Sequence, residues 1–111
     1  MKILIVEDET TAYENLVEIL AEVAPEAEVL DNTESIRQTV RWLQSHPKPD
    51  LILMDIHLSD GSSFAIFEHT EVESPIIFTT AYDQYAIDAF KVNSIDYLLK
   101  PIKPEDLRRA L

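Results

Sequence analysis

The chain has 111 residues and a mass of 12.7 kDa, the size of one globular domain and too small for two. Its 21 acidic and 9 basic residues give a formal charge of −12, which repels nucleic acids and anionic membranes at long range. The absence of cysteine excludes disulfides and thiolate metal sites and suits a reducing compartment, and the apolar runs are far shorter than the ~20 residues that span a bilayer. We therefore expect a cytoplasmic domain that binds neither nucleic acid nor membranes directly.

Hydrophobic periodicity predicts alternating strands and helices in the first half of the chain. A β-branched run is followed by apolar residues at helical spacing, which Pro25 ends, and the same alternation then repeats until Pro47 and Pro49. The expected segments are a strand at 2–6, a helix over 12–23, a weak edge strand at 27–30 and a helix over 36–43.

The second half continues the pattern. The expected segments are a wholly apolar strand at 51–54, a turn at Ser59–Gly61, a short amphipathic stretch around Phe64 and Phe67, a strand at 76–78 closed by Thr79 and Thr80, a helix over 85–90, a strand at 97–99 and a helix that begins near Pro104. Since no capping signal precedes Leu111, we expect that the last helix, and a further domain after it, belong to a longer parent chain.

Five strands alternating with five helices predict one α/β domain over residues 1–111, with a doubly wound parallel sheet covered by helices on both faces. In such sheets the ligand site lies beyond the carboxyl ends of the strands. Those ends carry polar residues here, namely Glu7 and Asp8, Asp55, Thr80 and Lys100.

Three of these residues are acids, and they converge if the first and third strands are neighbours, because adjacent strands lie ~4.8 Å apart. Two carboxylates at 4 Å repel by roughly 4 kcal/mol at an effective dielectric of about 20, which a hard divalent cation such as Mg²⁺ relieves. A hydroxyl at Thr80 and a cation at Lys100 suit a bound phosphoryl group. Asp55 is then best placed to attack phosphorus and form an aspartyl phosphate.

The sequence resembles a response regulator receiver domain over its whole length. The motifs that carry the resemblance are Ile3-Leu4-Ile5-Val6-Glu7-Asp8-Glu9, Asp50-Leu51-Ile52-Leu53-Met54-Asp55-Ile56-His57-Leu58-Ser59-Asp60-Gly61, Thr80-Ala81 and Lys100-Pro101. The segment from Phe78 to Pro101 further resembles receivers that precede a LytTR-type DNA-binding domain.

The resemblance implies a flavodoxin-like (CheY-like) fold with strand order 2-1-3-4-5. It implies that Asp55 accepts a phosphoryl group from a histidine kinase, that Lys100 contacts the phosphoryl oxygens, and that Thr80 and Tyr97 switch with it. Mg²⁺ would be held by Glu7, Asp8, Asp55 and the main-chain carbonyl of His57, and the bond before Pro101 is a candidate cis peptide. The domain would assist its own phosphorylation and dephosphorylation without being a turnover enzyme.

The implied output is dimerisation through the face formed by the fourth helix, fifth strand and fifth helix, with DNA bound by an absent C-terminal domain. Two positions depart from the family pattern. Ser59 stands where many receivers have proline, and Glu7 replaces an aspartate, so that Asp8 is the better direct ligand and Glu7 reaches the metal through water.

Plainer interpretations stand beside these. Asp8 or Glu9 can cap the first helix, His57 can be a simple surface histidine, and Tyr97 can pack without switching. For the whole domain, one alternative is a phosphatase of the haloacid dehalogenase type, although that type has a second aspartate where His57 stands. Another alternative is a degenerate receiver that acts only as a docking module.

Overall fold

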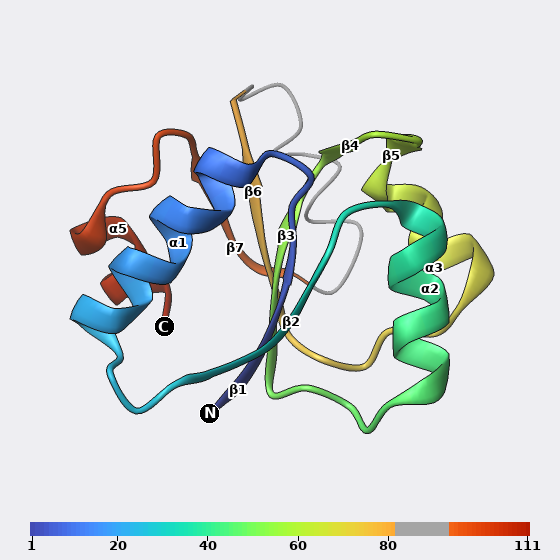
Figure 1. Cartoon of the computed structure of the whole chain (residues 1–111), viewed down its shortest axis with the longest axis horizontal. Coiled ribbons are helices and arrows are strands. Elements are labelled where there is room, and N and C mark those ends of the chain that lie inside the picture. The colour runs from blue at the N-terminus through green and yellow to red at the C-terminus, as the bar shows by residue number, and fades with distance from the viewer. Residues whose placement is uncertain (82–93) are drawn as a thin grey trace.

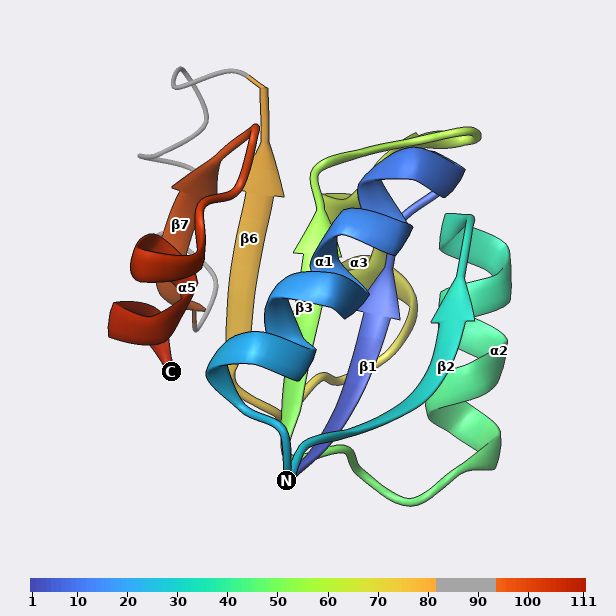
Figure 2. The same ribbon diagram turned by 60° about the vertical axis from the view of Figure 1, so that its left-hand side comes forward.

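The computed structural model describes residues 1–81 and 94–111. Its centre is a parallel five-stranded sheet in the order β2-β1-β3-β6-β7, which Figure 2 shows edge to edge. The strands are β1 (Lys2–Val6), β2 (Glu28–Thr33), β3 (Leu51–Asp55), β6 (Ile76–Thr80) and β7 (Ser94–Leu99). Counting these five strands alone, the order is 2-1-3-4-5, so the expected doubly wound topology is confirmed.

Helices cover both faces of the sheet (Figure 1). On one face lie α1 (Thr10–Val23) and α5 (Pro104–Ala110), and on the other lie α2 (Ile36–Ser45), a 3₁₀ turn (Ser63–Ala65) and α3 (Ile66–His69). Among these described helices, none combines the length and apolar character that a membrane crossing requires.

Two apolar clusters, one on each face of the sheet, form the core. Because side chains alternate along a strand, Ile3 and Ile5 face α1 and α5, whereas Leu4 and Val6 face α2 and α3. All five residues of β3 are buried, as expected for a central strand covered on both faces. Burying each such aliphatic side chain contributes about 1.5–3 kcal/mol, so the inner strands position the rim residues firmly.

Most expected elements are found, with three corrections. Strand β7 begins at Ser94 rather than at residue 97, because the polar residues Ser94 and Asp96 carry no hydrophobic pattern. The edge strand β2 ends at Thr33 rather than at residue 30, because exposed polar residues such as Asp31 are tolerated at a sheet edge. The amphipathic stretch around Phe64 and Phe67 forms only the 3₁₀ turn and the four-residue α3. The helix expected over 85–90 lies outside the described residues.

A small antiparallel hairpin follows the carboxyl end of β3. Its strands β4 (His57–Leu58) and β5 (Gly61–Ser62) flank the expected turn, and Gly61 has the positive φ of 132° that favours glycine. Asp60 accepts hydrogen bonds from the backbone N–H groups of Ile36 and Arg37, and the bond from Ile36 above all holds the pKa of Asp60 below its usual value. The hairpin is therefore attached to the beginning of α2.

Two buried serines, Ser63 in the 3₁₀ turn and Ser74 shortly before β6, differ in hydrogen bonding. The Ser63 hydroxyl has no partner among the residues that the structure describes, whereas the Ser74 hydroxyl donates to the Pro49 carbonyl at 2.8 Å. We expect Ser63→Ala to raise the free energy of unfolding by up to about 1 kcal/mol and Ser74→Ala to lower it by about 1 kcal/mol. Urea denaturation of both variants tests this, and equal losses of stability would contradict it.

Candidate functional site

The acidic residues expected at the strand ends do converge. Strands β1 and β3 are paired in register, with Val6 opposite Met54, so Glu7 directly after β1 comes beside Asp55 at the end of β3. The carboxylates of Glu7, Asp8 and Asp55 each offer an oxygen, and these oxygens lie within 4.8 Å of one another. We call these three residues the acidic cluster.

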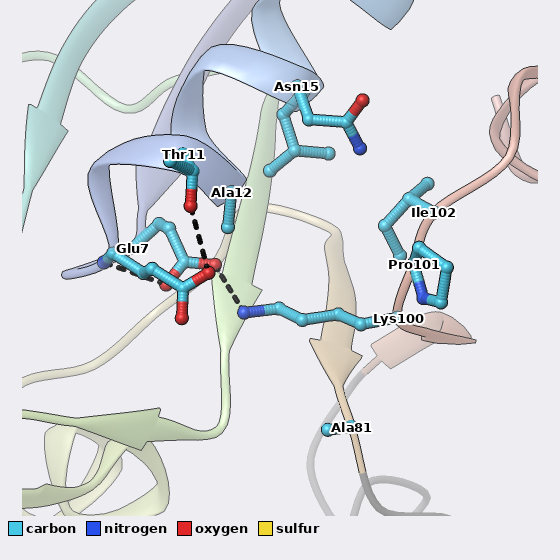
Figure 3. Close-up of a pocket in the computed structure, with 10 residues that line it drawn as sticks. Glu7, Thr11, Ala12, Asn15, Ala81, Lys100, Pro101 and Ile102 are labelled. Atoms are coloured by element: carbon cyan, nitrogen blue, oxygen red, sulfur yellow. Dashed lines mark hydrogen bonds and ion pairs between the residues drawn. The ribbon is translucent and has the colours of Figure 1, made fainter.

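Lys100 follows the edge strand β7, and its side chain extends to the acidic cluster. Its Nζ lies 2.6 Å from Glu7 Oε1 and 3.1 Å from Asp55 Oδ2, and Figure 3 shows the side chain extending from the segment after β7 toward Glu7. Glu7 is 1% exposed and Asp55 is 6% exposed, so both ion pairs form where water screens them weakly. The Lys100 backbone N–H also donates to the Thr80 carbonyl at 2.7 Å, which fixes the start of this segment.

Burial and charge shift the acid–base behaviour of this pair. Burial raises the pKa of the Glu7 carboxyl above its ordinary value, and the hydrogen bond from Lys100 offsets this only in part because the Asp55 charge acts in the same direction as burial. Burial acts to lower the pKa of Lys100, but the hydrogen bond to Glu7 and the negative charge of Asp55 outweigh it and raise that pKa. Lys100 is therefore a permanent cation beside the cluster at neutral pH.

The backbone around Asp55 supplies a further contact. The His57 N–H donates to Asp55 Oδ1 at 3.3 Å, so His57 touches the cluster through its main chain while the residue itself is exposed. Glu9 occupies the N-cap position of α1 but makes no side-chain capping bond. Helix capping by Glu9 therefore does not explain the acidic sequence after β1.

Thr80 and Tyr97 lie on the two strands at the other side of Asp55. Thr80 ends β6 and is fully buried, and its neighbour Thr79 is the residue opposite Asp55. Tyr97 lies opposite Phe78 and is half-buried against the core cluster that faces α2 and α3. The peptide bond between Lys100 and Pro101 is cis, the isomer that the resemblance implies.

The acidic cluster fits a hard divalent cation. Three carboxylates and one ammonium leave a formal charge of −2 at one place, and oxygen donors are the ligands that Mg²⁺ prefers. Glu7 is buried and Asp8 is exposed, so one part of the cluster is enclosed by protein and another part is open to solvent.

A hollow of about 400 Å³ adjoins the cluster through Glu7 and Lys100. Figure 3 shows it between the first turns of α1, where Ala12 and Asn15 lie, and the segment that carries Pro101 and Ile102. Asp8 and Asp55 do not line this hollow, so it is a neighbouring depression rather than the cluster itself.

Two contacts were not foreseen from the sequence. Lys100 bonds to Glu7 as well as to Asp55, and no sequence pattern specifies that pairing between residues 93 positions apart. The sequence predicts Asp60 only as part of a turn. An aspartate before a glycine indicates a turn, but it does not indicate that the Asp60 side chain accepts a hydrogen bond from the backbone of α2.

The chain belongs to the response regulator receiver domain family. Residues 3–111 match the family model described as "Response regulator receiver domain". The crystal structure of the response regulatory domain of protein mrkE from Klebsiella pneumoniae has a TM-score of 0.83 with this fold at 30% sequence identity, over 99% of this chain and 91% of that one.

Among curated relatives, sensory transduction protein LytT of Enterococcus faecalis is 37% identical over 114 residues. The positive alginate biosynthesis regulatory protein of Pseudomonas aeruginosa is 37% identical over 115 residues. Both alignments cover 100% of this chain but 46% of the relative, so the chain spans about half the length of these proteins.

The raised pKa of Glu7 predicts how stability depends on pH without metal. Its folded-state pKa exceeds the unfolded value, so folded protein binds more protons and stability falls as pH rises from about 4.5 through the folded pKa. With a chelator present, we expect Glu7→Gln to gain stability relative to wild type between pH 4 and 7. Denaturant titrations at several pH values measure this. Glu14→Gln, at an exposed position of α1, is the control, and parallel curves for all three proteins would contradict the expectation.

Proposed function

We propose that this receiver domain is a phosphorylation switch in which Asp55 accepts a phosphoryl group from a histidine kinase. One observation carries the assignment to Asp55: its carboxylate lies in the acidic cluster and also contacts the Lys100 ammonium at 3.1 Å. A carboxylate held in that setting, at the end of a rigid central strand, is oriented for attack while the nearby cation attracts an anionic donor.

The chemical step is a transfer between two nucleophiles. One Asp55 carboxylate oxygen forms a bond to phosphorus while the bond between phosphorus and the donor histidine nitrogen breaks, and that nitrogen keeps the electron pair. The product is an acyl phosphate on Asp55. Lys100, already within hydrogen-bond distance of Asp55, is placed to donate to the incoming phosphoryl oxygens.

We propose that Glu7, Asp8, Asp55 and the main-chain carbonyl of His57 hold Mg²⁺, with Asp8 as a direct ligand. When bound, Mg²⁺ neutralises negative charge on the phosphoryl oxygens. The support is the set of carboxylate oxygens within 4.8 Å of one another and the charge of −2 that remains after Lys100 is counted. The buried Glu7 is already bonded to Lys100, which favours the more exposed Asp8 for direct contact.

The proposed output is a change on the face formed by β7 and α5. A phosphoryl group adds about −1.5 to −2 charge at Asp55, and its contacts with Thr80 and Lys100 would favour one conformation of β6 and β7, with Tyr97 following. A shift from 1:99 to 99:1 needs roughly 5.5 kcal/mol, which a few charge-assisted hydrogen bonds can supply. The fourth helix of this expected face lies outside the described residues.

We further propose that phosphorylation drives dimerisation and controls a DNA-binding domain beyond this chain, in a cytoplasmic regulator. The support is the likeness to LytT and to the alginate regulatory protein, which are about twice as long as this chain. A phosphatase of the haloacid dehalogenase type is disfavoured, because the residue two positions after Asp55 is His57 rather than an acid. A docking module without phosphorylation is disfavoured, because Asp55, Glu7, Asp8 and Lys100 are all present and gathered.

Incubation with Mg²⁺ and a small phosphodonor such as acetyl phosphate tests the acceptor. We expect intact mass measurement to show one acid-labile phosphoryl group on wild type and none on Asp55→Asn, because the amide removes the attacking oxygen. Asp50→Asn, at the opposite end of β3, is the matched control and is expected to react like wild type. Phosphorylation of Asp55→Asn would refute the assignment, and continued release of phosphate far beyond one equivalent would favour the phosphatase.

Light scattering tests the proposed dimer. We expect the molar mass of the domain to rise from that of a monomer toward twice that value when a beryllofluoride phosphoryl mimic is added with Mg²⁺. The Asp55→Asn variant is expected to keep its mass under the same conditions. An unchanged mass for wild type, with the mimic shown to be bound, would exclude dimerisation as the output of this domain alone.

A further inference from the structure

The tip of the β4–β5 hairpin is attached to the beginning of α2 by side chains. Asp60 Oδ1 accepts from the Ile36 N–H at 2.8 Å, and Asp60 Oδ2 accepts from the Arg37 N–H at 3.2 Å. Ser59 Oγ donates to the Glu34 carbonyl at 3.3 Å. These bonds join segments more than 20 positions apart, so Asp60 is not a local cap of the kind that Ser35 provides.

The base of the same hairpin lies at the acidic cluster. The Ile56 N–H donates to the Thr79 carbonyl at 3.1 Å, which attaches the first residue of the base to β6. The Ser63 N–H donates to the Ile56 carbonyl at 2.7 Å, which closes the base between its two ends. His57, between base and tip, donates its N–H to Asp55. The hydrogen bonds of Ser59 and Asp60 hold the tip against the segment that begins α2.

Close packing supports the side-chain bonds at the tip. A Cβ atom placed on Gly61 would lie 3.4 Å from Ile36 Cδ1, and the positive φ of Gly61 already favours glycine there. The hairpin therefore sits directly against the first residue of α2.

We propose that Asp60 is a positioning residue for the metal site, which holds the His57 main-chain carbonyl in place by tying the hairpin to α2. This inference rests on the proposed function, because it concerns the Mg²⁺ site described there. Asp60 is not a member of the acidic cluster, and its carboxylate accepts from the backbone of α2. Its effect would be transmitted through the hairpin, whose strands β4 and β5 pair with each other and whose Leu58 packs in the core cluster that faces α2 and α3.

A matched pair of variants separates positioning from helix stability. Asp60→Ala removes the bonds from Ile36 and Arg37, and Ser35→Ala removes the bond from the Gln38 N–H to Ser35 Oγ at the same helix end. Both variants weaken the beginning of α2, but only Asp60→Ala releases the hairpin. Asp60→Asn keeps one acceptor oxygen and is the conservative variant.

Calorimetric titration of the purified domain with MgCl₂ measures the consequence. We expect Asp60→Ala to bind Mg²⁺ about tenfold more weakly than wild type, the lower end of the range for residues that orient metal ligands, with Asp60→Asn between the two. Ser35→Ala is expected to bind like wild type. Equal affinities for Asp60→Ala and Ser35→Ala would overturn the proposal and reduce Asp60 to a helix cap.

Amide hydrogen exchange in metal-free protein gives a second measurement that does not depend on Mg²⁺. We expect the His57 N–H to exchange faster in Asp60→Ala and to be unchanged in Ser35→Ala, and unchanged exchange in both would overturn the proposal. If wild type itself takes up no Mg²⁺, the proposed metal site fails, and the exchange of His57 still decides whether Asp60 restrains the hairpin. If Asp60→Ala does not fold, Ser59→Ala with Asp60→Asn carries the same comparison.

Discussion

The contact of Lys100 with two carboxylates at the ends of other strands is the interaction on which the site depends. Strand β6 lies between β3 and β7, so the lysine must extend across the end of β6, about two strand spacings of ~4.8 Å, to reach Asp55. Its backbone bond to Thr80 fixes the starting point of that reach. Without this cation, three acids at one rim would repel one another where burial leaves little screening.

The same arrangement sets a cost in stability that the core offsets. Glu7 is buried as a charged group and its pKa is raised, so the site is less stable than a neutral rim would be. The two apolar clusters pack against both faces of the sheet, and all five residues of the central strand β3 are buried. Function and stability are thus divided along β1, β3 and β7: the apolar residues stabilise the sheet, and Glu7, Asp55 and Lys100 carry charge at the strand ends.

The sequence was sufficient for the fold and for the acids of the site, because each has a local signal. The apolar run of β3 ends in Asp55 and that of β1 ends in Glu7, and parallel strands place such ends at one edge. The sequence predicts a shorter β2 than the structure has, because polar edge residues carry no hydrophobic pattern. The pairing of Lys100 with Glu7 and the reach of Asp60 to Ile36 depend on tertiary distances, which periodicity does not encode.

Under the proposed function, phosphorylation changes the competition for Lys100. In the structure the Lys100 ammonium lies 2.6 Å from Glu7 Oε1 and 3.1 Å from Asp55 Oδ2. The shorter ion pair is therefore the one with Glu7, which is not the proposed phosphoacceptor. A phosphoryl group on Asp55 carries more negative charge than the carboxylate it replaces, and would draw the ammonium away from Glu7. Because the Lys100 backbone is bonded to Thr80, such a movement pulls on the ends of β6 and β7 together. The ion pair that neutralises the unmodified site therefore also connects the modified site to the far edge of the sheet.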